Sequence, residues 1–356
     1  MARDSRSMAS GNGSGRSRRI QLVTSGLGTG YGGIGVVSAS VMAGLAWDND
    51  VALWTNRTSW VRAVRRALLL SEALLGCWRN PPDFVFYEHV HLAAMHAVLP
   101  RLRSIPYGVF LHGTEVWEPL SGRRREALER ATILISNSAS TVRRSREFNP
   151  WLGPVRITWL GVRVPAAAPD VRSKAPVAII VGRLVPGERG KGHDSVLGAW
   201  PLVRRGVPDA RLVIIGNGAD LPRLERRVRR EEIPGVEFRP RLTDLERNHA
   251  YESARVFLFP SRQEGFGLAP VEAAGWGIPL LGLAGTVMEE LFPAGEGAVL
   301  VDNLEPAALA APIIKLLRDG EAAAALGQAA RQRVRSVFQE DQFIERLRAA
   351  LLPVLP

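Results

Sequence analysis

Residues 256–279 read VFLFPSRQEGFGLAPVEAAGWGIP. The four apolar residues at 256–259 predict a short buried strand, and the segment from Pro270 onward predicts a helix. A loop that contains Glu264 and Gly267 joins the two. A strand, a loop and a helix in this order form the unit from which parallel sheets covered by helices are built. This stretch therefore predicts an α/β fold.

The loop of this stretch has the chemistry of an anion site between two carboxylates. Gly267 lets a ligand approach the backbone closely, and the first amides and the dipole of the following helix favour a negative charge. Glu264 and Glu272 flank these amides in the sequence. Carboxylates accept hydrogen bonds from hydroxyl groups. The pattern therefore suits a ligand with a central diphosphate and hydroxyl-rich groups on both sides, which describes a nucleotide sugar.

The rest of the chain repeats the strand and helix pattern in two series. Short apolar segments stand first at 20–25, 51–55, 84–87, 107–111, 132–136 and 156–159, and then at 177–181, 210–215, 236–238, 256–259 and 279–283. Helical segments separate them, which predicts two doubly wound domains in tandem. Such domains bind ligands beyond the carboxyl ends of their strands, so we expect the site in the cleft between the domains.

The domain boundaries follow from changes in composition along the chain. We expect a disordered tail at 1–18, a Rossmann-like domain at 19–165, a linker at 166–176, a second Rossmann-like domain at 177–335, and a final helix at 336–356 that can return to the first domain. The tail is rich in Ser, Gly and Arg, and the linker is rich in Pro and Ala, so neither has the apolar period of a packed element.

The overall composition limits the partners and the compartment. The chain has 356 residues with 46 basic and 35 acidic side chains, a net charge of +11 that favours anionic partners. Cys77 is the sole cysteine, so an intramolecular disulfide is excluded and a reducing compartment is indicated. Because there is no long apolar run and no apolar N-terminal segment, we expect a cytoplasmic protein.

The stretch at 256–279 resembles the signature of family 4 glycosyltransferases, retaining enzymes of the GT-B fold of the type called glycosyl transferases group 1. The resemblance rests on Glu264 and Glu272, eight positions apart after a Pro-Ser strand end. Further matching elements are Val181-Gly182-Arg183-Leu184, Lys191-Gly192, Gly216-Asn217-Gly218, Gly32-Gly33 and Leu111-His112-Gly113-Thr114-Glu115. The match is dense over residues 175–283 and thinner in the first domain.

The resemblance implies roles for single residues. Arg183 and Lys191 would bind the donor diphosphate, which gains charge as the nucleotide leaves. Glu272 would hold the ribose hydroxyls, and Glu264 would hold those of the transferred sugar. The remaining implied donor contacts are Gly33 in the first domain, the backbone at Phe266, Gly267 and Leu268, and, near the base, Arg241 and Leu242.

The resemblance also implies the reaction. A hexose would pass, with retention of configuration, from a UDP- or GDP-linked donor to a saccharide or lipid-linked acceptor in polysaccharide or glycolipid biosynthesis. The first domain would bind the acceptor, and His112 would lie near the acceptor and the sugar. His112 and Glu264 are thus the candidate catalytic residues. The leaving phosphate would take the acceptor proton, and no cofactor or metal is expected.

Other patterns favour different functions. Gly28, Gly30 and Gly33 have the spacing of a dinucleotide fingerprint, but no acidic residue closes the following strand. Another nucleotide-sugar enzyme of the same fold, such as an epimerase, would need an acid–base set that the sequence does not identify. A nucleic-acid-binding protein would suit the basic charge but would need stacking aromatic residues on a basic stripe. A sugar-binding scaffold without activity is a further alternative.

Two patterns suggest metals. Asp48-Asn49-Asp50 has the form used by metal-dependent transferases, but it is expected at the amino side of the sheet. His89, His91 and His96 near Glu88 could suggest zinc, although a strand end and a helix explain them without a metal.

A basic segment at 61–78 has two readings. Arg62, Arg65 and Arg66 precede a leucine-rich run, as in an amphipathic helix on an anionic membrane surface. A domain helix with a solvated basic edge has the same pattern. The first reading would make the protein peripheral on the inner face of the membrane.

Overall fold

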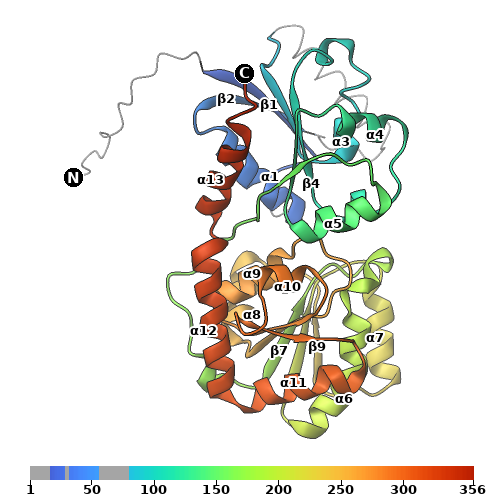
Figure 1. Ribbon diagram of the computed structural model, residues 1–356. Coiled ribbons are helices and arrows are strands. Elements are labelled where there is room, and N and C mark those ends of the chain that lie inside the picture. Colours follow the sequence, from blue (N-terminus) through green and yellow to red (C-terminus); the bar gives the residue numbers. More distant parts are fainter. Residues whose placement is uncertain (1–16, 29–31, 56–79) are drawn as a thin grey trace, which may run out of the picture.

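The computed structural model describes residues 17–28, 32–55 and 80–356. Within these residues the chain forms two six-stranded sheets, one in each of the two domains that are stacked in Figure 1. All neighbouring strands in both sheets run parallel. The predicted α/β class with two doubly wound domains is therefore confirmed.

The first domain has the strand order β2-β1-β3-β4-β5-β6. Its strands are β1 (Arg18–Thr24), β2 (Asn49–Thr55), β3 (Phe84–Tyr87), β4 (Tyr107–Leu111), β5 (Ile133–Ser136) and β6 (Val155–Ile157). Its helices are α1 (Gly32–Leu45), α3 (Val90–Ala93), α4 (Gly122–Glu129) and α5 (Ala139–Phe148), with 3-10 turns η2 (Pro100–Leu102) and η3 (Thr114–Val116). All residues of β3, β4 and β5 are buried, as expected for parallel strands with both faces covered.

The second domain has the strand order β12-β11-β10-β7-β8-β9. Its strands are β7 (Val177–Val181), β8 (Arg211–Ile215), β9 (Val236–Arg239), β10 (Val256–Phe259), β11 (Leu280–Leu283) and β12 (Ala298–Val301). Its helices are α6 (His193–Gly206), α7 (Leu221–Arg230), α8 (Asp244–Ser253), α9 (Leu268–Gly275), α10 (Val287–Leu291), α11 (Pro306–Arg318) and α12 (Gly320–Val337), with 3-10 turns η4 (Val171–Ser173) and η5 (Pro186–Lys191).

The last helix, α13 (Glu340–Leu351), lies against α1 of the first domain, beyond the end of α12 (Figure 1). Leu347 of α13 is fully buried, and its Cδ2 lies 3.2 Å from where a Cβ on Gly44 of α1 would stand. Ser40 of α1 donates a hydrogen bond of 2.8 Å to Glu340. The end of the chain therefore completes the first domain.

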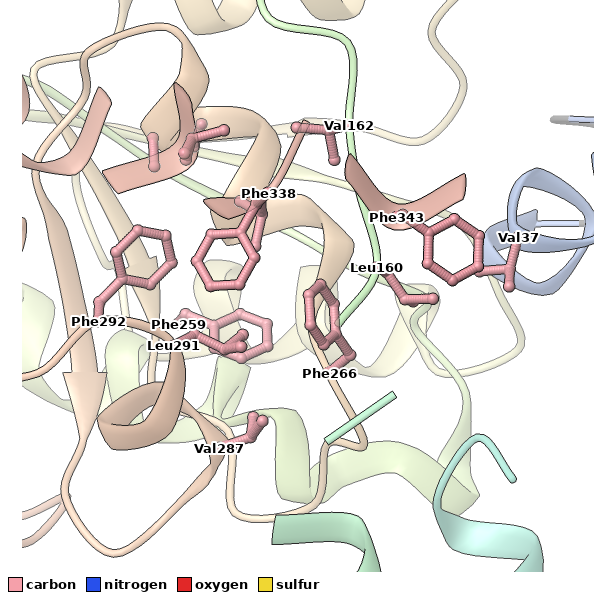
Figure 2. Close-up of a cluster of buried hydrophobic side chains, with 14 of the residues drawn as sticks. Val37, Leu160, Val162, Phe259, Phe266, Val287, Leu291, Phe292, Phe338 and Phe343 are labelled. Carbon is pink, nitrogen blue, oxygen red and sulfur yellow. The ribbon is translucent and has the colours of Figure 1, made fainter. Parts of the chain in front are cut away.

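A cluster of buried aromatic and aliphatic side chains connects the two domains (Figure 2). Phe338, between α12 and α13, packs edge-on against Phe266 of the second-domain loop, with ring centroids 5.9 Å apart. Phe343 of α13 lies beside Val37 of α1 in the same view, with Leu160 nearby. The loop that contains Glu264 and Gly267 is thus anchored by apolar packing beneath it.

The strand β12 was not among the predicted strands. It pairs only with β11, at the edge of the second sheet, and two of its four residues are partly exposed. Its sequence, AVLV, is an apolar run as long as those of β3 and β10, so a signal for this strand is present and the prediction missed it. The predicted helical region from residue 304 onward divides into α11, α12 and α13.

Candidate active site

Nine of the eleven predicted site residues line one cavity of about 510 Å³ between the domains. They are Gly33, His112, Arg183, Lys191, Glu264, Phe266, Gly267, Leu268 and Glu272. Arg241 and Leu242 line an adjoining cavity of about 370 Å³ that shares Gly182 and Arg183 with the first. The residues come from segments that follow β1 and β4 in the first sheet and β7, β9 and β10 in the second, so the cavities lie at the carboxyl ends of both sheets.

One end of the cavity carries a lysine between two carboxylates. The Nζ of Lys191 lies 3.0 Å from Oε2 of Glu264 and 3.5 Å from Oε2 of Glu188. Arg183 forms an ion pair with the other oxygen of Glu188 and is largely exposed. Lys191 is only 18% exposed, so its charge acts at short range on whatever enters the cavity. A phosphate would compete with Glu264 for this ammonium group.

The first turn of α9 forms the adjoining wall. Gly267 has a φ of +90°, which side chains rarely adopt, and a Cβ there would lie 2.9 Å from the ring of Phe259. Gly267, Leu268 and Ala269 all line the cavity. Because the first amides of a helix have no partner within it, this turn offers donors and a positive dipole end to an anion. Gly33 of the first domain lies opposite this turn. A Cβ on Gly33 would stand 3.7 Å from Cδ1 of Leu268.

Glu272 is held inside the cavity wall by two side chains of α8. The hydroxyl of Tyr251 donates a hydrogen bond of 3.0 Å to Oε2 of Glu272, and Nε of Arg247 lies 3.9 Å from the same oxygen. Burial raises the pKa of the Glu272 carboxyl, against the opposing effects of Arg247 and Tyr251. Glu272 therefore has one oxygen engaged and the other available as an acceptor for hydroxyl groups.

His112 is paired with a buried carboxylate from the neighbouring strand end. Its Nε2 lies 2.7 Å from the backbone carbonyl of Glu88 and 2.9 Å from Oε1 of the Glu88 side chain, which has no exposed surface. Thr24 donates to the second carboxylate oxygen at 3.2 Å. Burial lowers the pKa of His112, but the charge and hydrogen bonds of Glu88, with Glu115, raise it to about 9 overall. His112 is thus an imidazolium cation at neutral pH.

This pairing predicts a pH dependence of stability. The pKa of His112 rises from an ordinary 6.5 to about 9 on folding, so the folded state binds the proton more tightly. The stabilisation is complete below pH 6.5 and is lost as the pH rises through about 9. Between pH 6 and pH 10, the melting temperature of the native protein should fall more steeply than that of His112→Gln. Parallel curves for the two proteins would contradict the pairing.

Sequence reasoning missed two residues of this site. Arg247 lines the main cavity, the cavity beside Arg241, and a third of about 570 Å³ beside Glu340. Its Nε is buried without a hydrogen-bond partner. It lies inside α8 with no neighbouring motif, so no local signal identifies it. Glu88 directly follows a buried strand, where an acidic residue is a detectable signal.

The remaining sequence features concern membrane contact and metal binding. Arg62, Arg65 and Arg66 lie outside the described residues, so the structure gives no account of the predicted membrane contact. Among residues 17–28, 32–55 and 80–356, no three His, Cys, Asp or Glu side chains gather as metal ligands would. His89 and His91 stack on each other with centroids 4.9 Å apart. Within the same ranges, every helix is too short or too polar to span a bilayer.

The chain resembles known glycosyltransferases in sequence and in fold. The family model described as glycosyl transferases group 1 matches residues 166–333. A "GDP-mannose-dependent monoacylated alpha-(1-6)-phosphatidylinositol monomannoside mannosyltransferase" of Corynebacterium glutamicum is 30% identical over 66% of this chain and 67% of its own. A glycogen synthase of Mycobacterium tuberculosis is 29% identical over 82% of this chain and 73% of its own.

Solved structures share the fold at lower sequence identity. Sucrose-phosphate synthase of Thermosynechococcus elongatus has a TM-score of 0.78 at 18% identity, covering 95% of this chain and 99% of that one. Anabaena HepE in complex with UDP and glucose has a TM-score of 0.71 at 17% identity, covering 95% and 100%. With two facing parallel sheets, a cavity between them and these relatives, the chain belongs to the glycosyl transferases group 1 family of GT-B enzymes.

Proposed function

We propose that this enzyme is a retaining glycosyltransferase that moves a hexose from a UDP- or GDP-linked donor to a saccharide or lipid-linked acceptor, in polysaccharide or glycolipid biosynthesis. The observation that carries the proposal is the single cavity that holds Lys191, the α9 terminus, Glu264 and Glu272. The name of the mannosyltransferase relative supports a GDP-linked donor and a lipid-linked acceptor, and that of the glycogen synthase supports a saccharide acceptor. The UDP in the HepE complex supports a UDP-linked donor as the alternative.

The donor fits the cavity in one direction. Its diphosphate lies against Lys191 and the first turn of α9, which offer it an ammonium group and free helix amides. The ribose lies toward Glu272, and the base extends toward the adjoining cavity at Arg241 and Leu242. The transferred sugar then lies toward Glu264 and His112, where the two domains meet.

The chemical step needs stabilisation of the leaving nucleotide more than a protein base. The bond from the sugar anomeric carbon to the phosphate oxygen breaks, the acceptor hydroxyl oxygen bonds to that carbon on the same face, and its proton passes to the departing phosphate. Lys191, Arg183 and the α9 amides stabilise the charge that develops on the phosphate, without a bound metal.

His112 acts in this scheme as a positive hydrogen-bond donor. With its pKa raised to about 9 by Glu88, which outweighs the effect of burial, the ring retains its proton at neutral pH. A protonated ring cannot accept the proton of the acceptor hydroxyl. His112 therefore orients a sugar or acceptor hydroxyl, and Glu264, already paired with Lys191, accepts from another.

Thermal shift with UDP, GDP and ADP tests the donor site. We expect UDP or GDP, at about 100 times its Kd, to stabilise the protein by about 3 kcal/mol, which raises the melting temperature by several degrees. Inorganic pyrophosphate and the free nucleosides, at the same concentration, serve as controls and should each have a smaller effect. Failure of all three nucleotides to bind in calorimetry would refute the proposed function.

A further inference from the structure

The N-terminus of α5 in the first domain contacts the second domain at two points. One is the side chain of Glu290 on α10, and the other is the backbone carbonyl of Gly265, next to Glu264. We refer to these contacts together as the interdomain contact. Its members in the first domain are Ser138, Ala139, Ser140, Thr141 and Trp159, and those in the second are Gly265 and Glu290. In Figure 1, α5 and α10 face each other across the junction of the domains.

Glu290 of the second domain caps the N-terminus of α5 in the first domain. Its Oε1 accepts from the amide of Ala139 at 2.8 Å and from the indole of Trp159 at 2.7 Å, and its Oε2 accepts from the amide of Ser140 at 2.7 Å. A carboxylate at this position satisfies two amides that lack partners within the helix and interacts favourably with the helix dipole. Charge-assisted bonds of this kind are stronger than neutral ones.

The carbonyl of Gly265 is held by two buried hydroxyl groups of the same helix turn. Ser138 donates to it at 2.6 Å and Thr141 at 3.1 Å, and both side chains have no exposed surface. Gly265 is also pressed against the first domain, since a Cβ on it would stand 1.8 Å from the carbonyl oxygen of His112. Only glycine therefore fits at this point of the loop.

From this geometry we infer that Ser138, Thr141 and Glu290 are positioning residues, which act from across the domain boundary on the loop that holds the donor. Gly265 directly follows Glu264, whose carboxylate pairs with Lys191 in the cavity. The same contact brings His112 and Glu264 to one cavity. The inference rests on the proposed donor site and adds that these three side chains hold the backbone of its loop in place from across the domain boundary.

Spin labels test the contact independently of any ligand. With Cys77→Ser as background, cysteines replace Arg123 on α4 and Arg230 on α7, both exposed, and the distance distribution between the labels is measured. The double variant Thr141→Val with Glu290→Gln removes one of the two hydrogen bonds to the Gly265 carbonyl and the Glu290 charge, while keeping the side-chain volumes. We expect it to add a population at longer distance. A distribution equal to that of the unsubstituted protein would overturn the inference.

Affinity for UDP or GDP, whichever the native protein binds more tightly, tests the link to the donor. The double variant should bind it about tenfold more weakly, because only the closed fraction is competent. Ser140→Ala keeps the backbone amide and should match the native protein. Thr141→Ser restores the hydroxyl, so Thr141→Ser with Glu290→Gln should recover part of the loss. A longer label distance with unchanged affinity would show that the contact does not position the donor loop.

The two measurements separate the two proposals. If neither nucleotide binds the native protein, the proposed donor site fails while the label distances still report on the contact. If the nucleotide binds equally well to all variants and the distances do not change, the donor site stands and the positioning role is wrong.

Discussion

Lys191→Ala is expected to lower the affinity for the nucleoside diphosphate and to reduce turnover of the nucleotide sugar by about 100-fold or more. The ammonium group is mostly buried and lies 3.0 Å from Glu264 and 3.5 Å from Glu188. Its removal deletes a cation from the expected phosphate position and leaves two carboxylates whose charge then repels the phosphate. Calorimetry with UDP and GDP measures the first effect, and release of the nucleotide measures the second.

Lys315→Ala is the matched control, because this lysine is exposed on α11 in the second domain, away from the cavity. It should bind nucleotide like the native protein. Adding Glu264→Gln to Lys191→Ala removes one of the stranded carboxylates and should recover part of the diphosphate affinity. Unchanged affinity in Lys191→Ala would remove this lysine from the donor site.

Glu272→Gln should weaken binding of the nucleoside diphosphate by about 10- to 100-fold, through the loss of charged hydrogen bonds to the ribose hydroxyls. The same change should leave the melting temperature unchanged or slightly raised. Burial raises the pKa of the Glu272 carboxyl against the effect of Arg247, so the folded state holds its charge at some cost. A neutral amide keeps an oxygen to accept from Tyr251 at little loss of packing.

Inorganic pyrophosphate separates a ribose contact from a phosphate contact. Calorimetry should give Glu272→Gln the native affinity for pyrophosphate and a reduced affinity for UDP or GDP. Equal losses for both ligands would place Glu272 at the phosphates instead. A large fall in melting temperature without ligand would mean that the carboxylate stabilises the fold rather than the donor complex.

The strands that the sequence predicts best are those with both faces buried. The residues 84–87, 107–111, 177–181 and 256–259 are unbroken or nearly unbroken apolar runs, and they match β3, β4, β7 and β10 residue for residue. The edge strands match less well. The bounds of β2 and β6 differ by one or two residues from the predicted 51–55 and 156–159, and β12 was missed although AVLV is an apolar run. Burial on both faces therefore fixes the bounds of a strand in the sequence more sharply than partial exposure at a sheet edge does.

Some residues of the candidate site could also be predicted from the sequence, and others could not. Glu264 and Glu272 belong to one strand, loop and helix, so their spacing predicts that they face one cavity. The Glu88–His112 pair depends on β3 and β4 being neighbours in the sheet, which the sequence order alone does not establish. Glu290 and Ala139 are 151 residues apart and meet only through the packing of two domains. Contacts between residues so far apart in the chain can be identified only from the tertiary structure.

The packing of α13 on α1 bears on how the chain folds as it is synthesised. The α1 face that contains Gly44 and Val41 is covered by Leu347 and its neighbours, more than 300 residues later. A ribosome therefore completes the second domain before the first domain has its last helix. Until then, an apolar surface of the first domain is uncovered. The N-terminal domain usually folds first during synthesis, but here its final step follows the synthesis of the second domain.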